Sequence, residues 1–404
     1  MSDRNFTQPV IWPAVGHETL PWDLDLDAPA SRTARRRHRG PYVAAVPPDI
    51  AARSIALPSD TAATVDDACA EVSRFDAELG HEIAPFAAVL LRSESAASSQ
   101  IENLSASARA IAEAELHGHA GQNASLIVAN EHAMTAAVNL ADRIDADAIL
   151  QMHRALLERS QPSIAGQWRH EQAWIGGGDL GPHAAQFVPP QHARVPALID
   201  DLVAFIARDD IQVLAHAAVA HAQFETIHPF PDGNGRTGRA LVQAQLRHKR
   251  LTRNVTVPVS AGLLTDTDAY FAALNRYREG DPLAVIEQFT RAAFAAVANG
   301  RQLVADLHAV RDEWNERVTA RRGSNSWKVV DLLLRKPVIN AGSIASELGI
   351  APQNTYRSLR PLLDAGVVVE FTDKKRNQLW RAPEVIEALE GFAARAGRRS
   401  RADI

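Results

Sequence analysis

Twelve residues near the middle of the chain, His228–Arg239, constrain the fold more than any other stretch, and they read H-P-F-P-D-G-N-G-R-T-G-R. Gly233 and Gly235 allow positive φ angles and close approach, so successive N–H groups can form a concavity that binds an anion. A helix predicted after Gly235 would aim its N-terminal amides at the same anion. The stretch is therefore suited to a polyphosphate ligand.

The charged side chains of this stretch suit the same ligand. Arg236 and Arg239 are three positions apart, so they share one helical face, and guanidinium groups bind phosphate through paired hydrogen bonds. Asp232 offers the carboxylate that magnesium takes beside phosphate oxygens. His228, with an ordinary pKa of about 6.5, is the natural general base of the set.

A structural interpretation of the same residues is a simple turn, because Pro, Asp, Gly and Asn are typical of loops between helices. An isolated histidine is also more often structural than catalytic. The turn explains any two of these residues, whereas an anion site explains all of them together. The combination favours the anion site.

The stretch resembles the signature of the Fic family, H-P-F-x-[D/E]-G-N-[G/K]-R-x-x-R, and every specified position matches. Members of this family mostly transfer AMP from ATP to a protein hydroxyl group. The resemblance implies that His228 is the base acting on that hydroxyl, that Asp232 binds Mg²⁺, that Arg236 binds the inner phosphates and that Arg239 binds the γ-phosphate. It implies nucleotide binding by Phe230, Asp232, Gly233, Asn234, Gly235, Arg236, Thr237, Gly238, Arg239, Tyr270 and Phe271.

A second stretch, S-E-S-A-A-S-S-Q-I-E-N, is similar to the inhibitory helix of the family, [S/T]-x-x-x-E-[G/N], at Ser98, Glu102 and Asn103. Ser98 and Glu102 share a helical face. The resemblance implies that Glu102 pairs with Arg239 and so competes with the γ-phosphate for one guanidinium group. A surface glutamate on an ordinary helix is the structural alternative.

Four glycines between Trp174–Ile175 and Phe187–Val188 predict a hairpin with a flexible tip. This hairpin is similar to the family's flap, which aligns the target segment by backbone pairing. The flap residues are then Ala185, Gln186, Phe187 and Val188. A purely structural hairpin is the alternative.

Tyr270 and Phe271 resemble the aromatic pair that borders the adenine in the family, usually two tyrosines. Phenylalanine at the second position keeps the stacking surface and removes a hydroxyl group. Core packing explains an aromatic pair equally well. His216 and His221, on the helix expected before the signature, are interpreted as packing residues because no cysteine or paired acid stands at zinc-ligand spacing.

The composition of the 404 residues, 46% apolar and 23% charged, is ordinary for a soluble globular protein of two or three domains. A net charge of −5 argues against a chain that coats nucleic acid. Cys69 is the only cysteine, which indicates a reducing compartment. No apolar run reaches membrane-spanning length and no signal-peptide pattern begins the sequence, so a cytoplasmic location is expected.

Residues 1–60 combine many prolines with five arginines between Arg32 and Arg39. This segment is predicted to be extended, wrapping the surface or partly disordered, and its basic cluster to be solvated rather than bound to nucleic acid. Helical spacing of apolar residues follows, above all from Ile211 to Ile227, and predicts a mainly α fold.

The C-terminal part is predicted to be a winged helix-turn-helix domain. Its helices are expected at Ser343–Leu348 and Pro352–Ala365, and its strands at Val367–Phe371 and Gln378–Trp380. The run of Thr355, Tyr356, Arg357, Leu359, Leu362 and Leu363 would give the second helix an apolar face, and the polar residues would face outward: Gln353, Asn354, Arg357 and Arg360. Lys374, Lys375 and Arg376 would form the tip of the wing. DNA contact and protein docking are both open for this module.

The expected fold is therefore mainly α: a Fic-type helical bundle with a small β-hairpin flap, followed by the winged helix-turn-helix domain. The expected divisions are 1–120 for an N-terminal segment with the inhibitory helix, 121–300 for the catalytic core, 301–325 for a helical linker, 326–390 for the winged helix and 391–404 for a basic tail. ATP and Mg²⁺ are the expected cofactors, and no membrane partner is expected.

The expected function is that of a protein adenylyltransferase autoinhibited by Glu102, with a protein hydroxyl as target, on another protein or on the chain itself. The alternatives are removal of AMP, transfer of another nucleotidyl or phosphoryl group, and a nucleotide-sensing DNA-binding regulator. An intact His228 argues against a pure sensor, which needs no base. A toxin paired with a separate antitoxin ranks lowest, because the inhibitory motif is in the same chain. Homo-oligomerisation is open.

Overall fold

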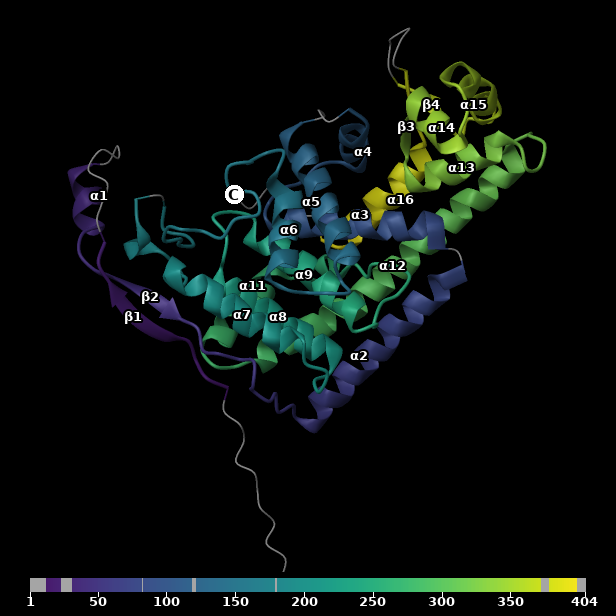
Figure 1. The fold of residues 1–404 in the computed structure, drawn as a ribbon. Helices are drawn as coiled ribbons and strands as arrows, with labels where there is room; N and C mark the ends of the chain where they lie inside the picture. The colour runs from purple at the N-terminus through teal and green to yellow at the C-terminus, as the bar shows by residue number, and fades with distance from the viewer. Residues whose placement is uncertain are drawn as a thin grey trace, which may run out of the picture. The chain divides into compact units, whose positions relative to one another are not determined.

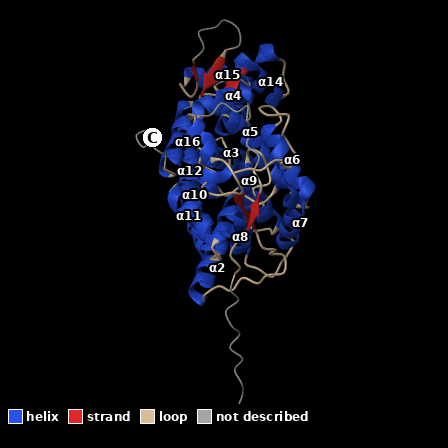
Figure 2. Ribbon diagram, turned by 90° about the vertical axis from the view of Figure 1, so that its left-hand side faces the viewer, coloured by secondary structure: helices blue, strands red, loops and turns tan. Residues whose placement is uncertain are grey.

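Helices form most of the described chain in the computed structural model (Figures 1 and 2). The structure describes residues 12–22, 31–81, 83–117, 121–178, 180–371 and 378–397. The fold is mainly α, as the sequence predicted. No stretch of the described helices, even in the longest one, combines the length and apolar character needed to cross a membrane.

The chain forms two compact units, and each is built from separated stretches of sequence. The first unit comprises Met1–Cys69, Ala136–Leu251 and Asp268–Thr290, and the second comprises Ala70–Thr135, Thr252–Thr267 and Arg291–Ile404. Helices α2 (Ser59–Glu78), α5 (Gln122–Asn139) and α12 (Leu283–Arg317) contain residues of both units. The structure thus divides the chain differently from the linear boundaries expected at 120 and 300.

The first unit is built around helix α8, whose residues from Leu214 to Ile227 are all buried. A helix that is buried on all sides lies at the centre of its unit. Gly238 of the next helix lies so close to α8 that a Cβ there would come within 2.9 Å of the Phe224 ring. The helices of this unit are α1 (Arg32–Arg37), α6 (Ala146–Leu157), α7 (Val195–Ile206), α8 (Val213–Ile227), α9 (Asn234–His248) and α11 (Thr267–Arg278).

The described N-terminal residues include two extended strands that pair as an antiparallel ribbon, a pairing that was not expected from the sequence. Strand β1 (Gly16–Leu20) pairs with β2 (Tyr42–Val46), with Gly16 opposite Val46 and Leu20 opposite Tyr42 (Figure 1). Helix α1 lies within the basic cluster, where the side chains of Arg36 and Arg37 are exposed. Cross-strand pairing satisfies the backbone groups that an isolated extended chain would leave to water.

The second unit combines α3 (Ile83–Ile101) with the C-terminal part of the chain. Glu94 of α3 accepts hydrogen bonds from the backbone N–H and the hydroxyl of Ser260, at 2.8 and 2.7 Å, and so anchors α3 to the start of α10. The other elements of this unit are α4 (Ala108–His117), α10 (Val259–Leu264), α13 (Asn325–Arg335), β3 (Val338–Asn340), α14 (Ala341–Leu348), α15 (Thr355–Asp364), β4 (Val369–Glu370), β5 (Leu379–Arg381) and α16 (Pro383–Arg395).

The C-terminal helices and strands lie close to their expected positions. The strands form a sheet in the order β3-β5-β4. Asn340 caps α14 by accepting from the N–H of Ser343, and Gly349 ends that helix with a left-handed conformation. Tyr356 differs from the expectation, because it is 49% exposed and lies on the polar face with Arg357 rather than on the apolar face. The tip expected at residues 373–377 and the end of the basic tail lie outside the described residues, and the winged-helix identity stays a prediction.

Candidate active site

The loop between α8 and α9 places His228 at the end of the buried helix. His228 has φ 50° and ψ 61°, and its N–H donates to the carbonyl of Phe224 at 2.9 Å. This left-handed conformation is unfavourable for a residue with a Cβ and is retained where the surroundings enforce it, commonly at functional sites.

Asn234 closes the loop. Its Oδ1 accepts from the N–H of Phe230 and its Nδ2 donates to the carbonyl of Phe230, both at 2.9 Å. The predicted phosphate contact of the Asn234 side chain stays a prediction, because in this structure both ends of the amide hold the loop together. The backbone N–H of Asn234 remains at the start of the helix.

Gly233 begins α9 with φ 77°, and a Cβ at this position would come within 2.9 Å of Leu156. Glycine is therefore required both by the backbone angle and by the space. The first helical hydrogen bond runs from the N–H of Thr237 to the carbonyl of Gly233, at 3.0 Å. The amides of Asn234 and Gly235 precede it, and a helix start of this kind presents its amides to an anion.

Aromatic rings pack against Phe230 of the loop. The ring of Phe230 lies parallel to His153, with a centroid distance of 3.7 Å, and against Trp168 at 4.9 Å. Nδ1 of His153 accepts from the N–H of Gly166, so Nε2 carries the proton and donates to the carbonyl of Asp232 at 3.0 Å. Burial lowers the pKa of His153 to about 4, which keeps the ring neutral.

Arg169 holds the other side of the loop, although it is only 4% exposed. Its Nε donates to the carbonyl of His228 at 2.8 Å, and its other guanidinium nitrogens donate to the carbonyls of Glu171, Pro190 and Ile227. Burial lowers the pKa of Arg169 to about 10, so the group stays charged at neutral pH. No motif or spacing in the sequence identifies this residue, because its acceptors are backbone carbonyls from three separate segments.

The carboxylate of Asp232 is half-exposed and held in a defined orientation. Oδ2 accepts from Nε2 of Gln161 and Oδ1 from the N–H of Gly233, both at 2.6 Å. Within the described part of the chain, no group of three His, Cys, Asp or Glu side chains could hold a metal by itself. One oriented carboxylate fits Mg²⁺, which takes its other ligands from phosphate and water.

Burial and two arginines determine the protonation state of His228. Burial, followed by the charges of Arg169 and Arg278, lowers the pKa of His228 to about 3, while the carbonyl of Glu225 and the carboxylate of Asp232 act in the opposite direction. Its Nδ1 is buried and has no hydrogen-bond partner among the described residues. The imidazole is therefore neutral at pH 7 and able to accept a proton.

The remaining residues of the signature lie on α9. Arg236 and Arg239 are both buried, and Nη2 of Arg236 is 3.7 Å from Oδ1 of Asp232. Thr237 is fully buried, and Gly238 lies against α8. The structure thus brings Arg236 to Asp232 at the start of the helix, and the predicted phosphate contacts of both arginines stay predictions.

The aromatic pair separates into a core residue and a surface residue. Tyr270 is 1% exposed and its hydroxyl lies 2.7 Å from Nε2 of His221, whereas Phe271 is 43% exposed. The structure differs here from the expected adenine border, because a ring buried in this way offers no free face to a ligand. Phe271 alone presents a stacking surface. His216 is also fully buried, with Nε2 2.8 Å from the carbonyl of Phe205, so both histidines of α8 pack in the interior.

The predicted flap contains a single antiparallel bridge between Ile175 and Phe187 rather than two strands. The N–H of Ile175 donates to the carbonyl of Phe187, and the N–H of Gln186 to the carbonyl of Ile175, both at 2.8 Å. Gly177 allows the tip to close, since a Cβ there would come within 2.3 Å of the Ala184 carbonyl. Gln186 is exposed, and Ala185 and Phe187 are partly buried.

Two segments far away in the sequence hold the flap in place. The guanidinium of Arg278 lies 3.8 Å above the ring of Phe187. From the N-terminal ribbon, the N–H of Ala45 donates to the carbonyl of Val188 at 2.9 Å, and Trp22 packs edge-on against Trp174. The carbonyl of Val188 is therefore already paired. The N–H groups of Ala185, Gln186 and Phe187 are paired as well, the first with Pro182 and the other two with Ile175, and the target-binding role of this edge stays a prediction.

The predicted inhibitory segment lies at the C-terminal end of helix α3, in the second unit. Ser98 is fully buried, and Glu102 and Asn103 are exposed beyond the last helical residue. Asn103 has φ 60°, its N–H donates to Gln100 at 2.9 Å, and the N–H of Leu104 donates to Ser99 at 3.0 Å. This is a Schellman ending, in which glycine or asparagine adopts the left-handed conformation most easily. The pattern thus explains why Asn follows Glu102, and the pairing of Glu102 with Arg239 stays a prediction.

The fold and the site define a class: a mainly helical protein in which a glycine-opened loop joins two core helices and holds a neutral histidine beside an oriented carboxylate. A model of the Fic/DOC family matches residues 143–246, which include α6–α8 and most of α9. The chain therefore carries a Fic/DOC family domain, as the signature predicted.

Curated relatives resemble this part of the chain. A probable protein adenylyltransferase of Aquifex aeolicus is 31% identical over 162 residues, which are 36% of this chain and 47% of that protein. A protein adenylyltransferase of Caenorhabditis elegans is 32% identical over 143 residues, 35% of this chain and 25% of that protein. The chain thus spans less than half the length of these relatives.

Two solved structures align with parts of this chain. A Fic family protein from Desulfovibrio desulfuricans aligns with a TM-score of 0.48 and 20% identity, over 81% of this chain and 97% of that one. Fic-1 from C. elegans aligns with a TM-score of 0.45 and 21% identity, over 60% of this chain and 74% of that one.

Proposed function

We propose that this protein is a protein adenylyltransferase, which transfers AMP from ATP to a hydroxyl side chain of a protein. The observation that carries the proposal is the neutral His228 at the mouth of a loop whose next helix begins with amides suited to an anion. The relatives named as protein adenylyltransferases support the same activity. In this reaction His228 takes the proton of the target hydroxyl, whose oxygen attacks the α-phosphorus while the bond to the β-phosphate breaks and pyrophosphate leaves.

The positions of the loop residues suggest how the chain would hold ATP. The amides of Asn234 and Gly235 stabilise charge on the α- and β-phosphates, with Arg236 and Arg239 as the guanidinium partners of the phosphate chain. Asp232, oriented by Gln161, would hold Mg²⁺. When bound, the ion would supply positive charge that offsets the negative charge of the phosphates. Phe271 supplies a surface for the adenine.

The flap would place the target. The N–H groups of Ala185–Phe187 are used within the flap, so an extended target segment would donate hydrogen bonds to the carbonyls of Ala185 and Gln186. The target is then a protein segment with a Ser, Thr or Tyr residue at the position that faces His228.

Autoinhibition belongs to the same proposal. Glu102, which follows directly on α3, occupies the guanidinium of Arg239 and excludes a productive γ-phosphate. Because Asn103 stops the helix immediately afterwards, the position of Glu102 depends on the end of α3.

The test compares the wild type, Glu102→Gly and His228→Ala, each with Mg²⁺ and ATP labelled at the α- or the γ-phosphate. We expect protein-bound label from α-labelled ATP only, stronger in Glu102→Gly and absent in His228→Ala. Label from γ-labelled ATP would instead establish phosphoryl transfer. Loss of bound AMP from a modified protein, abolished by Glu102→Gly, would establish AMP removal.

A second candidate function, DNA contact, rests on the exposed face of α15. Tyr356, Arg357 and Arg360 are exposed there, with Gln353 and Asn354 just before the helix. These side chains suit base edges and phosphates. Salt-dependent binding of duplex DNA that is lost in Arg357→Ala, with AMP transfer retained, would support it. No binding at low salt would leave the module as a protein-docking or dimer element.

A further inference from the structure

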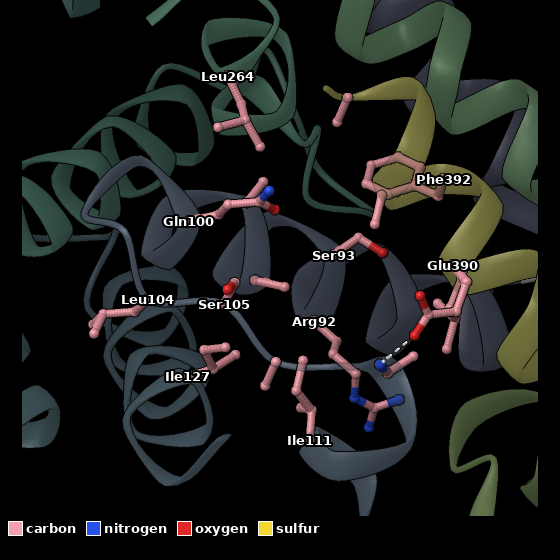
Figure 3. Close-up of a pocket in the computed structure, with 17 residues that line it drawn as sticks. Arg92, Ser93, Gln100, Leu104, Ser105, Ile111, Ile127, Leu264, Glu390 and Phe392 are labelled. Atoms are coloured by element: carbon pink, nitrogen blue, oxygen red, sulfur yellow. Dashed lines mark hydrogen bonds between the residues drawn. The ribbon is translucent and has the colours of Figure 1, made fainter. Parts of the chain in front are cut away.

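A pocket of about 120 Å³ lies within the second unit, between α3 and α16 (Figure 3). Arg92, Ser93 and Gln100 line it from α3, and Phe392 and Ala393 line it from α16. Apolar side chains from three further segments complete the wall: Leu104, Ile127 and Leu264. The pocket therefore joins the inhibitory helix to the last helix of the C-terminal part.

One buried polar atom in this pocket has no partner. Ser93 is 5% exposed, and its Oγ makes no hydrogen bond with any described residue. Ser95, two positions further along the same helix, shows the usual alternative, because its Oγ donates to the carbonyl of Leu91 at 3.0 Å. A buried hydroxyl without a partner is unfavourable, so the Ser93 hydroxyl indicates a ligand atom that pairs with it.

The charged groups of the pocket are already engaged. Arg92 makes two hydrogen bonds with the carboxylate of Glu115, at 2.6 and 3.0 Å, and a third with the carbonyl of Arg335. Glu390 accepts from the N–H of Ala108 at 2.7 Å, as the dashed line in Figure 3 marks. A charged ligand would lose its hydration without gaining an oppositely charged partner, so binding of a charged ligand is unfavourable.

The size limits the ligand as well. An apolar protein cavity of roughly 150 Å³ holds benzene, so this pocket suits a body of similar size. A peptide segment does not fit into this volume. Phe392, Ile127 and Leu264 provide the apolar contacts.

We propose that this pocket binds a small neutral molecule with a ring-sized apolar body and one hydrogen-bonding group, which pairs with the hydroxyl of Ser93. The ligand contacts Gln100 and Leu104, which flank Glu102 and both take part in the Schellman ending of α3. Binding therefore stabilises the observed end of the helix. If Glu102 inhibits the enzyme as proposed above, the same ligand holds Glu102 in its inhibitory position and acts as an inhibitor of AMP transfer.

The binding test uses 4-fluorobenzyl alcohol as the probe and 4-fluorotoluene as its counterpart without a hydroxyl group, both followed by ¹⁹F NMR on the full chain. We expect saturable binding of the alcohol in the wild type. Ser93→Ala should weaken binding of the alcohol by roughly fivefold and leave the affinity for 4-fluorotoluene unchanged, because only the hydrogen bond is removed. Equal weakening of both probes, or no saturable binding by either, would overturn the proposal and indicate that water satisfies Ser93.

A pair of alanines on α16 gives a matched control. Ala393 lines the pocket, whereas its neighbour Ala394 is exposed and does not. Ala393→Phe should fill the pocket and weaken both probes by more than about tenfold, and Ala394→Phe should leave binding unchanged. Equal binding in the two variants would place the probe elsewhere. Circular dichroism verifies the folding of each variant, and the Ser93→Ala comparison decides the matter where Ala393→Phe does not fold.

The coupling to α3 has a readout that does not depend on activity. Saturating 4-fluorobenzyl alcohol should slow amide hydrogen exchange at residues 101–105 in the wild type and not in Ser93→Ala at the same concentration. Unchanged exchange in the occupied wild type would overturn the coupling. If the ligand slows exchange in the wild type but Glu102→Gly transfers no label from α-labelled ATP, the proposed function is refuted and the proposed ligand site stands.

Discussion

The guanidinium Nε of Arg169 donates to the backbone carbonyl of His228 at 2.8 Å, and after burial the positive charge of Arg169 is the next cause of the lowered pKa of the His228 imidazole. One buried side chain thus holds the candidate base in its left-handed conformation and favours the neutral form that accepts a proton. Arg169 does so with no carboxylate among the partners that its guanidinium contacts in the described structure.

Replacement of Arg169 by alanine should affect both stability and activity. Several buried carbonyls lose their donor, so the free energy of unfolding should fall by about 3 kcal/mol in chemical denaturation. The rate of transfer should fall by roughly 10²-fold, because His228 is no longer held in place. Arg159→Ala, at an exposed position on the surface, is the control, with an expected change below about 0.5 kcal/mol. A stable Arg169→Ala protein with normal transfer would contradict this role.

The pH dependence of transfer should reflect the lowered pKa of His228. The pKa of His228 lies well below 6.5, so the imidazole is already deprotonated at pH 6. We therefore expect kcat/KM to show no titration near pH 6.5 and to remain flat from pH 8 to below pH 6. Arg278→Met removes one of the charges that lower this pKa, so the acidic decline should move to higher pH. A wild-type profile with a midpoint at pH 6.5 would show that the histidine titrates normally.

Glu131 should make stability fall as pH rises. Burial, opposed by Arg92 and reinforced by Glu115, raises the pKa of Glu131 to about 7. The folded state then keeps a proton that the unfolded state releases above pH 4.5, so the contribution is present at low pH and is lost towards pH 7. Relative to Glu131→Gln, the wild type should lose on the order of 2 kcal/mol between pH 5 and 8. Equal pH dependence of the two proteins in urea denaturation would contradict this.

Glycine and alanine at position 103 should affect stability and AMP transfer differently. Asn103→Gly retains the left-handed conformation that ends α3, and its free energy of unfolding should change little. Asn103→Ala should destabilise the second unit by about 1 kcal/mol and raise AMP transfer, because Glu102 is held less firmly. Matched thermal melts and transfer assays of the two variants test this, and higher transfer in the glycine variant than in the alanine variant would argue against it.

The two aromatic residues at 270 and 271 should behave differently. Phe271→Ala should raise the KM for ATP by roughly tenfold with little loss of stability, since an exposed ring contributes mainly to the ligand. Tyr270→Phe should leave this KM unchanged and lower the free energy of unfolding by about 1–2 kcal/mol, because the hydrogen bond with His221 is lost. The opposite pattern in the two variants would place the adenine against Tyr270.

The local conformations of the site were predictable because they depend on neighbouring residues. Gly233, whose φ angle and missing Cβ allow the tight start of α9, was identified from its type and position alone. The same holds for the buried helix before His228 and for the helices and strands after residue 325, where apolar spacing and caps are encoded within each segment. Tyr356 was assigned to the wrong face, because a tyrosine is compatible with either an apolar or an exposed position.

Other features depend on contacts between segments that are distant in the sequence. Arg169 binds carbonyls from three segments, His153 stacks on Phe230, and Ala45 pairs with Val188. No spacing rule connects these residues, since their proximity arises only when the helices pack. By itself the sequence determined which residues bend the chain and which can carry charge or a proton. The tertiary structure decided which of them are buried, and burial sets the pKa of His228 and leaves the hydroxyl of Ser93 without a partner.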